Sequence, residues 1–152
     1  MKIRIELESD LAEEEVVIRC NSLNDTVREI QRAVSEVLAD KKRWFFQKGE
    51  TTYYISLEDI LFFDSSPDGI CVHTRDDMYE TKYKLYELEE MLPGYFMRIS
   101  KSTILNVRQV YAVTRNLTAS SAVEFTGTNK QVYVSRHYYK ALRSRLDERY
   151  EE

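Results

Sequence analysis

The sequence predicts a mainly β protein, α+β overall, with few short helices and a small β-β-α segment in front. Short apolar stretches follow one another at intervals of about 8–12 residues, which is typical of packed antiparallel sheets. The chain contains 11 tyrosines but only 4 glycines and 2 prolines, a composition that favours strands. Clusters of turn-forming residues, such as Ser65–Gly69, separate the apolar stretches.

Residues 1–43 are expected to form the β-β-α segment, and residues 44–152 the β domain. Apolar and charged residues alternate over Lys2–Leu7, which is the period of a half-buried strand, and Glu15–Cys20 indicates a second strand. A capping box over Thr26–Glu29 is expected to precede a helix, whose apolar residues share one face: Val27, Ile30, Val34, Val37 and Leu38. This face could pack on its own strands, on the β domain or on a second subunit.

Short strands dominate the remainder of the chain, with two helices among them. A short helix is expected around Leu85–Leu92, where Pro93 ends it, and a final helix is expected to begin after Ser135. The expected strands are Phe45–Lys48, Thr52–Ser56, Ile60–Asp64, Ile70–Thr74, Met78–Tyr83, Thr103–Asn106, Gln109–Thr114, Ala122–Thr126 and Gln131–Val134.

Charge is strongly separated along the chain. The stretch from Met97 to Arg145 has nine Lys/Arg and a single acid, Glu124, whereas the rest has 13 basic and 25 acidic residues. A basic segment in an acidic protein favours binding to a polyanion, because neutralised phosphates release counterions. Alternatively, the basic face aids solubility or docks on the acidic half of the same chain.

Several classes of protein are disfavoured by the sequence. No run of about 18 apolar residues is present, as a transmembrane helix would need, and the N-terminus lacks the apolar core of a secretory signal. The two cysteines, Cys20 and Cys71, lie far apart and indicate reduced thiols in the cytoplasm. No nucleophile–base pair or metal triad is evident, so neither an enzyme nor a cofactor is expected.

Three blocks of sequence together resemble the LytTR-type DNA-binding domain family. They are Tyr54–Asp64, Phe96–Asn106 and Val134–Tyr138, and they follow the family's order and spacing over about residues 45–148. The chain departs from the family pattern at Ser100, where many members carry histidine.

The resemblance implies an elongated stack of small antiparallel sheets with little helix. It also implies a bacterial transcriptional regulator that binds duplex promoter DNA. Members insert loops into successive major grooves of direct repeats, usually as two protomers side by side, so a homodimer on DNA is expected.

The resemblance also points to the loops that would contact bases. Arg136 follows the last strand, and arginine can pair with guanine O6 and N7 in bidentate fashion. Lys101 and Ser102 occupy the loop that the family inserts in the other groove. A third loop carries Ser66 and Asp68 and is not basic, so its contacts are expected to be fewer or made by backbone N–H groups.

Four further basic residues are candidates for phosphate contacts, with a solvated surface as the alternative: Arg98, Arg115, Lys140 and Arg143. Asn106 is expected to bond backbone in a turn rather than to touch DNA.

The segment in front of the family match is about 40 residues long, and no phospho-receiver arrangement fits in it. The chain therefore resembles the stand-alone type of regulator, whose genes often accompany a small membrane protein that restrains it. The apolar helix face at Val27–Leu38 is a candidate for a dimer or inhibitor contact, and packing within the subunit explains it equally well.

An RNA-binding or protein-docking β module is the alternative function. RNA recognition needs exposed aromatic side chains that stack on unpaired bases. The abundance of tyrosine leaves this alternative open, although Tyr111, Tyr133 and Tyr138 are expected at core or edge positions.

Overall fold

The computed structural model describes residues 1–12, 14–40 and 44–150. These residues form three α-helices, α1 (Asp25–Asp40), α2 (Leu85–Met91) and α3 (Arg136–Tyr150). Their strands are β1 (Phe45–Lys48), β2 (Thr51–Tyr54), β3 (Phe62–Ser66), β4 (Gly69–His73), β5 (Met78–Thr81), β6 (Phe96–Arg98), β7 (Thr103–Asn106), β8 (Val110–Thr114), β9 (Ser121–Phe125) and β10 (Gln131–Val134).

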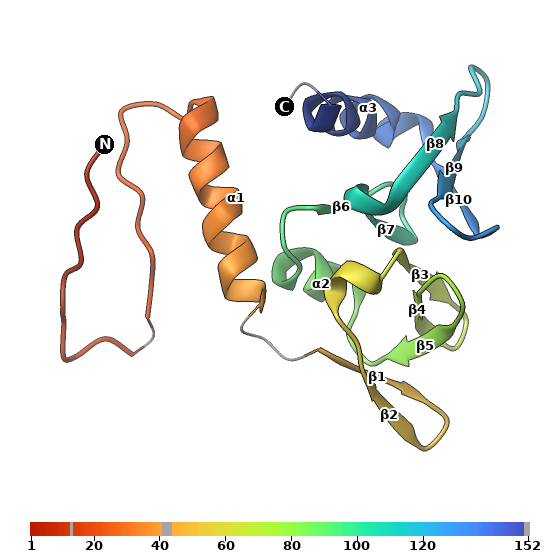
Figure 1. Ribbon diagram of the computed structural model, residues 1–152, viewed down its shortest axis with the longest axis horizontal. Coiled ribbons are helices and arrows are strands. Elements are labelled where there is room, and N and C mark those ends of the chain that lie inside the picture. Colours follow the sequence, from red (N-terminus) through yellow and green to blue (C-terminus); the bar gives the residue numbers. More distant parts are fainter. Residues whose placement is uncertain (13, 41–43, 151–152) are drawn as a thin grey trace.

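Two antiparallel sheets account for all the strands of the described residues. One sheet has the order β2-β1-β5-β4-β3-β7-β6, and the other has the order β10-β9-β8. In Figure 1 they form a stack that runs from α3 and the three-stranded sheet down to the β1–β2 hairpin, with α2 against the larger sheet. The predicted mainly β fold is thus confirmed.

Strand β7 and the first two residues of β3 are buried on both faces and separate two hydrophobic cores. Because successive side chains on a strand point to opposite faces, Phe63 enters the core beneath α2, whereas Phe62 enters the core beneath α3. The partner strand repeats the arrangement, with Ile104 paired to Phe63 and Leu105 paired to Phe62. One pair of strands therefore supports both halves of the stack.

A polar contact joins the turn between β4 and β5 to the three-stranded sheet. Arg75 donates from Nε to the Thr126 carbonyl at 2.9 Å. Lys130 donates from Nζ to the carbonyls of Thr74 at 2.8 Å and Asp77 at 2.6 Å. Since main-chain acceptors are involved, these bonds fix the relative position of the two sheets.

His73 lies at this junction, where we expect stability to depend on pH. Its ring stacks on Phe62 at 4.2 Å between centroids, and Nδ1 lies 3.4 Å from the Lys130 ammonium. Burial, together with the charge of Lys130, lowers the pKa of His73 to about 4. The folded protein therefore holds the neutral ring, whereas the unfolded chain takes up a proton near pH 6.5.

The free energy of unfolding is accordingly expected to fall as the pH drops from about 6.5 towards 4. Urea unfolding across this range, compared between wild type and His73→Gln, measures the effect. The variant should show a shallower decline, because carboxylates that titrate in the same range are common to both proteins. Parallel pH profiles would contradict this account of His73.

Most strands lie where the sequence predicts them, and β6 is an addition. The three residues Phe96–Arg98 form an edge strand that pairs with β7. Asn106 is buried, as expected for a structural residue: Nδ2 donates to the Ile60 carbonyl, and Oδ1 accepts from the Arg108 N–H.

The expected strands Lys2–Leu7 and Glu15–Cys20 are not formed. Among the described residues the first regular element is α1, and an isolated two-stranded hairpin is marginal in water. The apolar residues of the first stretch instead lie open to solvent. The capping box is also a wrong prediction, because Asn24 caps α1 by accepting the Val27 N–H on Oδ1 at 3.0 Å.

Helix α1 faces the β domain with its charged side. Arg32 pairs with Glu148 of α3 at 3.2 Å, and Glu36 pairs with Arg108 at 2.8 Å. On the predicted apolar face, Val27 is buried and Ile30 and Val34 are half-buried, whereas Val37 and Leu38 are exposed. Part of the basic segment thus docks on the acidic half of the chain, while apolar residues at the end of α1 lie open to solvent.

Candidate nucleic-acid interface

The loop of residues 100–102, between β6 and β7, lies at the centre of the candidate interface. On one side the Ser65 N–H donates to the Ser102 carbonyl at 2.8 Å, and on the other the Ser135 N–H donates to the Ile99 carbonyl at 2.9 Å. These two main-chain bonds hold the loop between the β3–β4 hairpin and the start of α3. The three loops that the sequence singled out therefore lie side by side.

Arg98 braces the loop from within. Its guanidinium donates from Nε to the Ser100 carbonyl at 3.0 Å and from a terminal nitrogen to the Lys101 carbonyl at 2.6 Å, and it pairs with Glu89 of α2 at 3.1 Å. Ser100 adds a local contact, since its hydroxyl accepts the Ser102 N–H at 3.2 Å. These contacts place the Arg98 guanidinium against the main chain of the loop, and the predicted phosphate contact of Arg98 stays a prediction.

We expect Arg98→Lys to weaken DNA binding although it keeps the charge. A lysine cannot reproduce the planar fork that reaches both carbonyls, so the loop loses its shape. The measurement is a binding titration over a range of salt concentrations, which should show lower affinity with an unchanged salt slope. If Arg98 contacted phosphate directly, Arg98→Lys would be tolerated and Arg98→Ala would reduce the slope by about one.

Helix α3 carries an exposed basic face that begins at this loop. Arg136, Lys140 and Arg143 follow at helical spacing and so share one side, whereas Leu142 and Leu146 pack in the core. Within the described residues, neither Arg136 nor Lys140 forms an ion pair, and the acid closest in sequence, Asp147, pairs with Arg143 at 3.7 Å. Lys101 is likewise exposed on the loop.

The β3–β4 turn presents a hydroxyl and a carboxylate instead of basic side chains. The Ser66 hydroxyl donates to the Gly69 carbonyl at 3.0 Å, which shapes the turn, and Asp68 is exposed. Gly69 has φ of 135°, a conformation that side chains rarely adopt. A carboxylate repels phosphate, so Asp68 fits a base-edge contact, such as the amino group of cytosine, better than a backbone contact.

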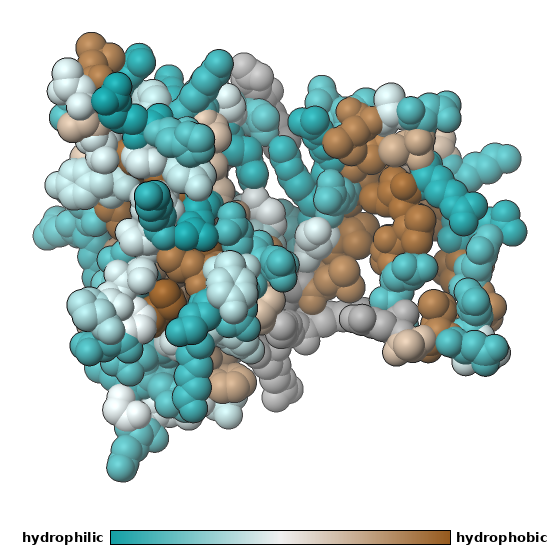
Figure 2. All heavy atoms as spheres, turned by 180° about the vertical axis from the view of Figure 1, so that it is seen from behind, coloured by the Kyte–Doolittle hydropathy of each residue, from teal (hydrophilic) through white to brown (hydrophobic). Residues whose placement is uncertain are grey.

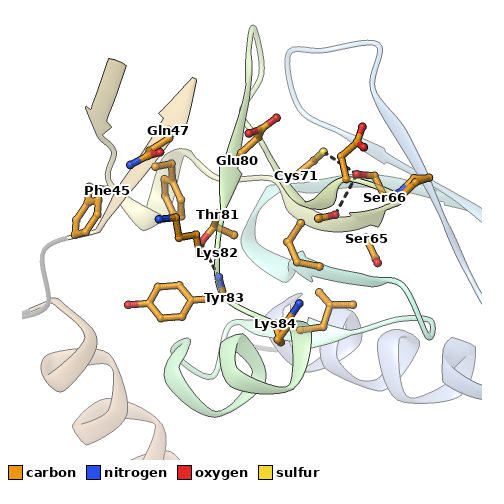
Figure 3. A pocket seen from close by; sticks show the side chains of 16 residues that line it. Phe45, Gln47, Ser65, Ser66, Cys71, Glu80, Thr81, Lys82, Tyr83 and Lys84 are labelled. Carbon is orange, nitrogen blue, oxygen red and sulfur yellow. Dashed lines mark hydrogen bonds between the residues drawn. The ribbon is translucent and has the colours of Figure 1, made fainter. Parts of the chain in front are cut away.

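Two lysines near this turn were not predicted from the sequence as candidates for DNA contact. Lys82 and Lys84 line the same hollow as Ser66 and Asp68, and Figure 3 shows the chain from Lys82 to Lys84 running past the strand that carries Ser65 and Ser66. Both lysines are exposed. They precede the basic segment in sequence, so only the pairing of β4 with β5 brings them here.

The other basic residues of the segment make contacts within the protein. Arg115 lies over the Tyr139 ring at 5.1 Å, and Arg108 lies over Tyr95 at 4.1 Å in addition to its pair with Glu36. Arg145 donates to the Gly94 carbonyl at 2.6 Å. Burial lowers the pKa of both Lys130 and Arg145, which is consistent with structural roles for these two cations.

Comparison with known proteins decides the family. The model of the LytTr DNA-binding domain matches residues 50–147. The chain belongs to the LytTR DNA-binding domain family. This LytTR protein is similar in fold to a solved LytTr DNA-binding domain from Bacillus cereus, with a TM-score of 0.62 at 20% identity, over 68% of this chain and 95% of that one.

Full-length relatives give the wider context. The LytTR chain is 28% identical to proteins named uncharacterized HTH-type transcriptional regulators in Staphylococcus aureus strains bovine RF122 / ET3-1 and NCTC 8325 / PS 47, over 96% of this chain and 98% of each relative. The matched family is one of DNA-binding domains, and these relatives are named as transcriptional regulators rather than enzymes, as the sequence predicted. No helix in the described part is long and apolar enough to cross a membrane.

Proposed function

We propose that the protein is a sequence-specific regulator that binds direct repeats in duplex promoter DNA through loops inserted in the major groove. Residues 44–152 carry the DNA contacts, and two protomers bind together. Bases are recognised by Arg136, Lys101 and Ser102. Fewer contacts come from the turn that carries Ser66 and Asp68. Lys140, Arg143 and Arg115 contact phosphates.

The observation that carries this proposal is the position of the loop of residues 100–102, which is held by main-chain bonds from Ser65 to Ser102 and from Ser135 to Ile99, the residue before the loop. These bonds present Lys101 and Arg136 on adjoining segments, and both side chains are exposed. A fixed frame with unpaired cations suits base recognition, because little ordering is needed on binding. Lys101 lies between β6 and β7, and Arg136 follows β10 directly as the first residue of α3, so loops and their borders are the proposed recognition elements.

Binding should weaken steeply with salt. Lys101, Arg115, Arg136, Lys140 and Arg143 are exposed, and each neutralised phosphate contributes about −0.9 to the slope of log K against log salt. We expect a slope magnitude of at least about 4 for a duplex with one repeat. Fluorescence anisotropy titrations between low and physiological salt measure it, and a flat profile would contradict the assignment of this face.

Competition between nucleic acids tests the proposal against the RNA-binding alternative. Labelled promoter duplex should be displaced by unlabelled duplex of the same sequence and not by single-stranded RNA of equal length. Tyr111 and Tyr133 are exposed on the edge strands β8 and β10, so they offer stacking surfaces for RNA. Preferential displacement by RNA, lost in Tyr111→Ala or Tyr133→Ala, would favour the alternative.

A further inference from the structure

The first residues of the chain present an apolar surface that nothing in the described structure covers. Ile3, Ile5 and Leu7 are 96%, 84% and 97% exposed. Figure 2 shows apolar side chains gathered on the side of the molecule that the N-terminal segment forms. Exposed apolar groups on this scale indicate an interaction surface.

The charged residues of the same stretch show which partner fits. The order of residues is Lys2, Ile3, Arg4, Ile5, Glu6, Leu7, Glu8, so two bases precede Ile5 and two acids follow it. If two copies pair antiparallel about a two-fold axis through Ile5, Arg4 lies opposite Glu6 and Lys2 opposite Glu8. On the other face, Ile5 meets Ile5 and Ile3 meets Leu7.

We propose that a second copy of this chain is the partner, and that residues 2–8 of the two copies form an antiparallel strand pair centred on Ile5. This inference deepens the proposed binding by two protomers and rests on it for its role on DNA. Opposite charges and apolar pairs directly across an antiparallel pair are stabilising, whereas like charges across it are destabilising.

The local geometry already suits such a strand. Arg4 and Glu6 form an ion pair at 3.0 Å in the described chain, with side chains 82% and 66% exposed, so they share one side of the segment. Residues 15–20 would add an outer strand from each copy. A stable sheet needs at least about three strands with an apolar face. The proposed sheet of four strands meets this requirement, whereas an isolated hairpin does not.

Helix α1 provides the surface that the new sheet would cover. Its charged side pairs with the β domain through Arg32 and Glu36, which leaves Val37 and Leu38 exposed. The apolar face of the paired strands would lie over these residues. A two-fold contact of this kind is isologous, so one set of residues serves both copies.

Charge reversal in the full-length protein tests the pairing. The change Arg4→Glu puts a carboxylate opposite the native Glu6 twice in each dimer, and Glu6→Arg puts a guanidinium opposite the native Arg4 twice. Each variant should dimerise at least about tenfold more weakly than wild type in sedimentation equilibrium. An equimolar mixture of the two should recover dimers, because every pair across the interface is then of opposite charge.

The mixture separates the proposal from a role of the ion pair within one chain, which mixing cannot restore. The double variant Arg4→Glu/Glu6→Arg is the matched control: it keeps the net charge and should dimerise like wild type. A monomeric wild type, unaffected single variants, or a mixture that stays monomeric would each overturn the pairing. In that case the surface serves a different partner.

Cysteine cross-linking tests the register, in a Cys20→Ser/Cys71→Ser background. Ile5→Cys should form a disulfide with itself under mild oxidation, since Cβ atoms directly across such a pair approach disulfide distance. Leu7→Cys should not cross-link to itself, but it should cross-link to Ile3→Cys in a mixture. Self-cross-linking at all three positions would indicate parallel pairing and would overturn the proposed register.

DNA binding distinguishes this inference from the proposed function. The charge variants should bind a probe with one repeat as wild type does, and lose affinity only on probes with two repeats. Intact dimers that fail to bind any duplex would refute the proposed function and leave the strand pairing standing.

Discussion

Replacing Arg136 with alanine is expected to reduce affinity for the cognate duplex by about 1–3 kcal/mol and to relax the preference at one base position. The side chain is exposed at the first residue of α3, next to the loop of residues 100–102, and none of the described acids forms an ion pair with it. Its five donors are therefore available for guanine. Gel-shift titrations on the cognate site and on single-base variants of it measure the change.

Lys140→Ala is the matched control for Arg136→Ala. Lys140 lies one turn further along the same face of α3 and is equally free of ion pairs among the described residues. As a phosphate contact it should weaken cognate and random duplexes alike. Equal losses on cognate and random DNA for Arg136→Ala would show that Arg136 does not recognise a base.

Replacing Phe63 with alanine is expected to lower the free energy of unfolding by about 3–5 kcal/mol. The side chain is fully buried in the core beneath α2, where its ring meets Phe46 at 6.1 Å and Phe96 at 5.8 Å between centroids. The cavity left behind is bordered by strands that also support the other core. Urea unfolding monitored by circular dichroism measures the loss.

Phe45→Ala provides the control, since Phe45 is 54% exposed on β1. This change removes a ring of the same size with little cavity, so the cost should stay below about 1 kcal/mol. A loss for Phe63→Ala no larger than that for Phe45→Ala would contradict the description of β3 as the shared centre of the two cores.

The strands were predictable where a short apolar stretch and the turn that ends it are adjacent in the sequence. The apolar stretch Ile60–Asp64 predicts a strand because it is short and bounded by the turn cluster at Ser65–Gly69. The β6 strand escaped prediction because it contains only Phe96–Arg98 and depends on pairing with β7. At the N-terminus, alternation predicts strands over Lys2–Leu7 and Glu15–Cys20, and this prediction is wrong for the described chain. The period of a strand is a local property, whereas a stable sheet needs more than the isolated hairpin that these two stretches could form.

The candidate site, like the strands, was predictable only in part. The basic segment and the family blocks predict Lys101 and Arg136 from sequence, and the structure exposes each of them in a loop or at its border. The contacts of Arg98 with the loop were not predictable, because its acceptors are main-chain carbonyls, which every residue has. Lys82 and Lys84 were missed because only strand pairing brings them to the β3–β4 turn.

The frame around the loop of residues 100–102 has a consequence for how such a protein can acquire new targets. The bonds from Ser65 to Ser102 and from Ser135 to Ile99 use only main-chain groups, so they persist whatever side chains stand at the exposed positions. Lys101 and Arg136 can therefore be exchanged without moving the backbone that presents them. On the proposed function, single substitutions at these positions would change the preferred DNA sequence while the fold and the spacing between the contacts stay constant.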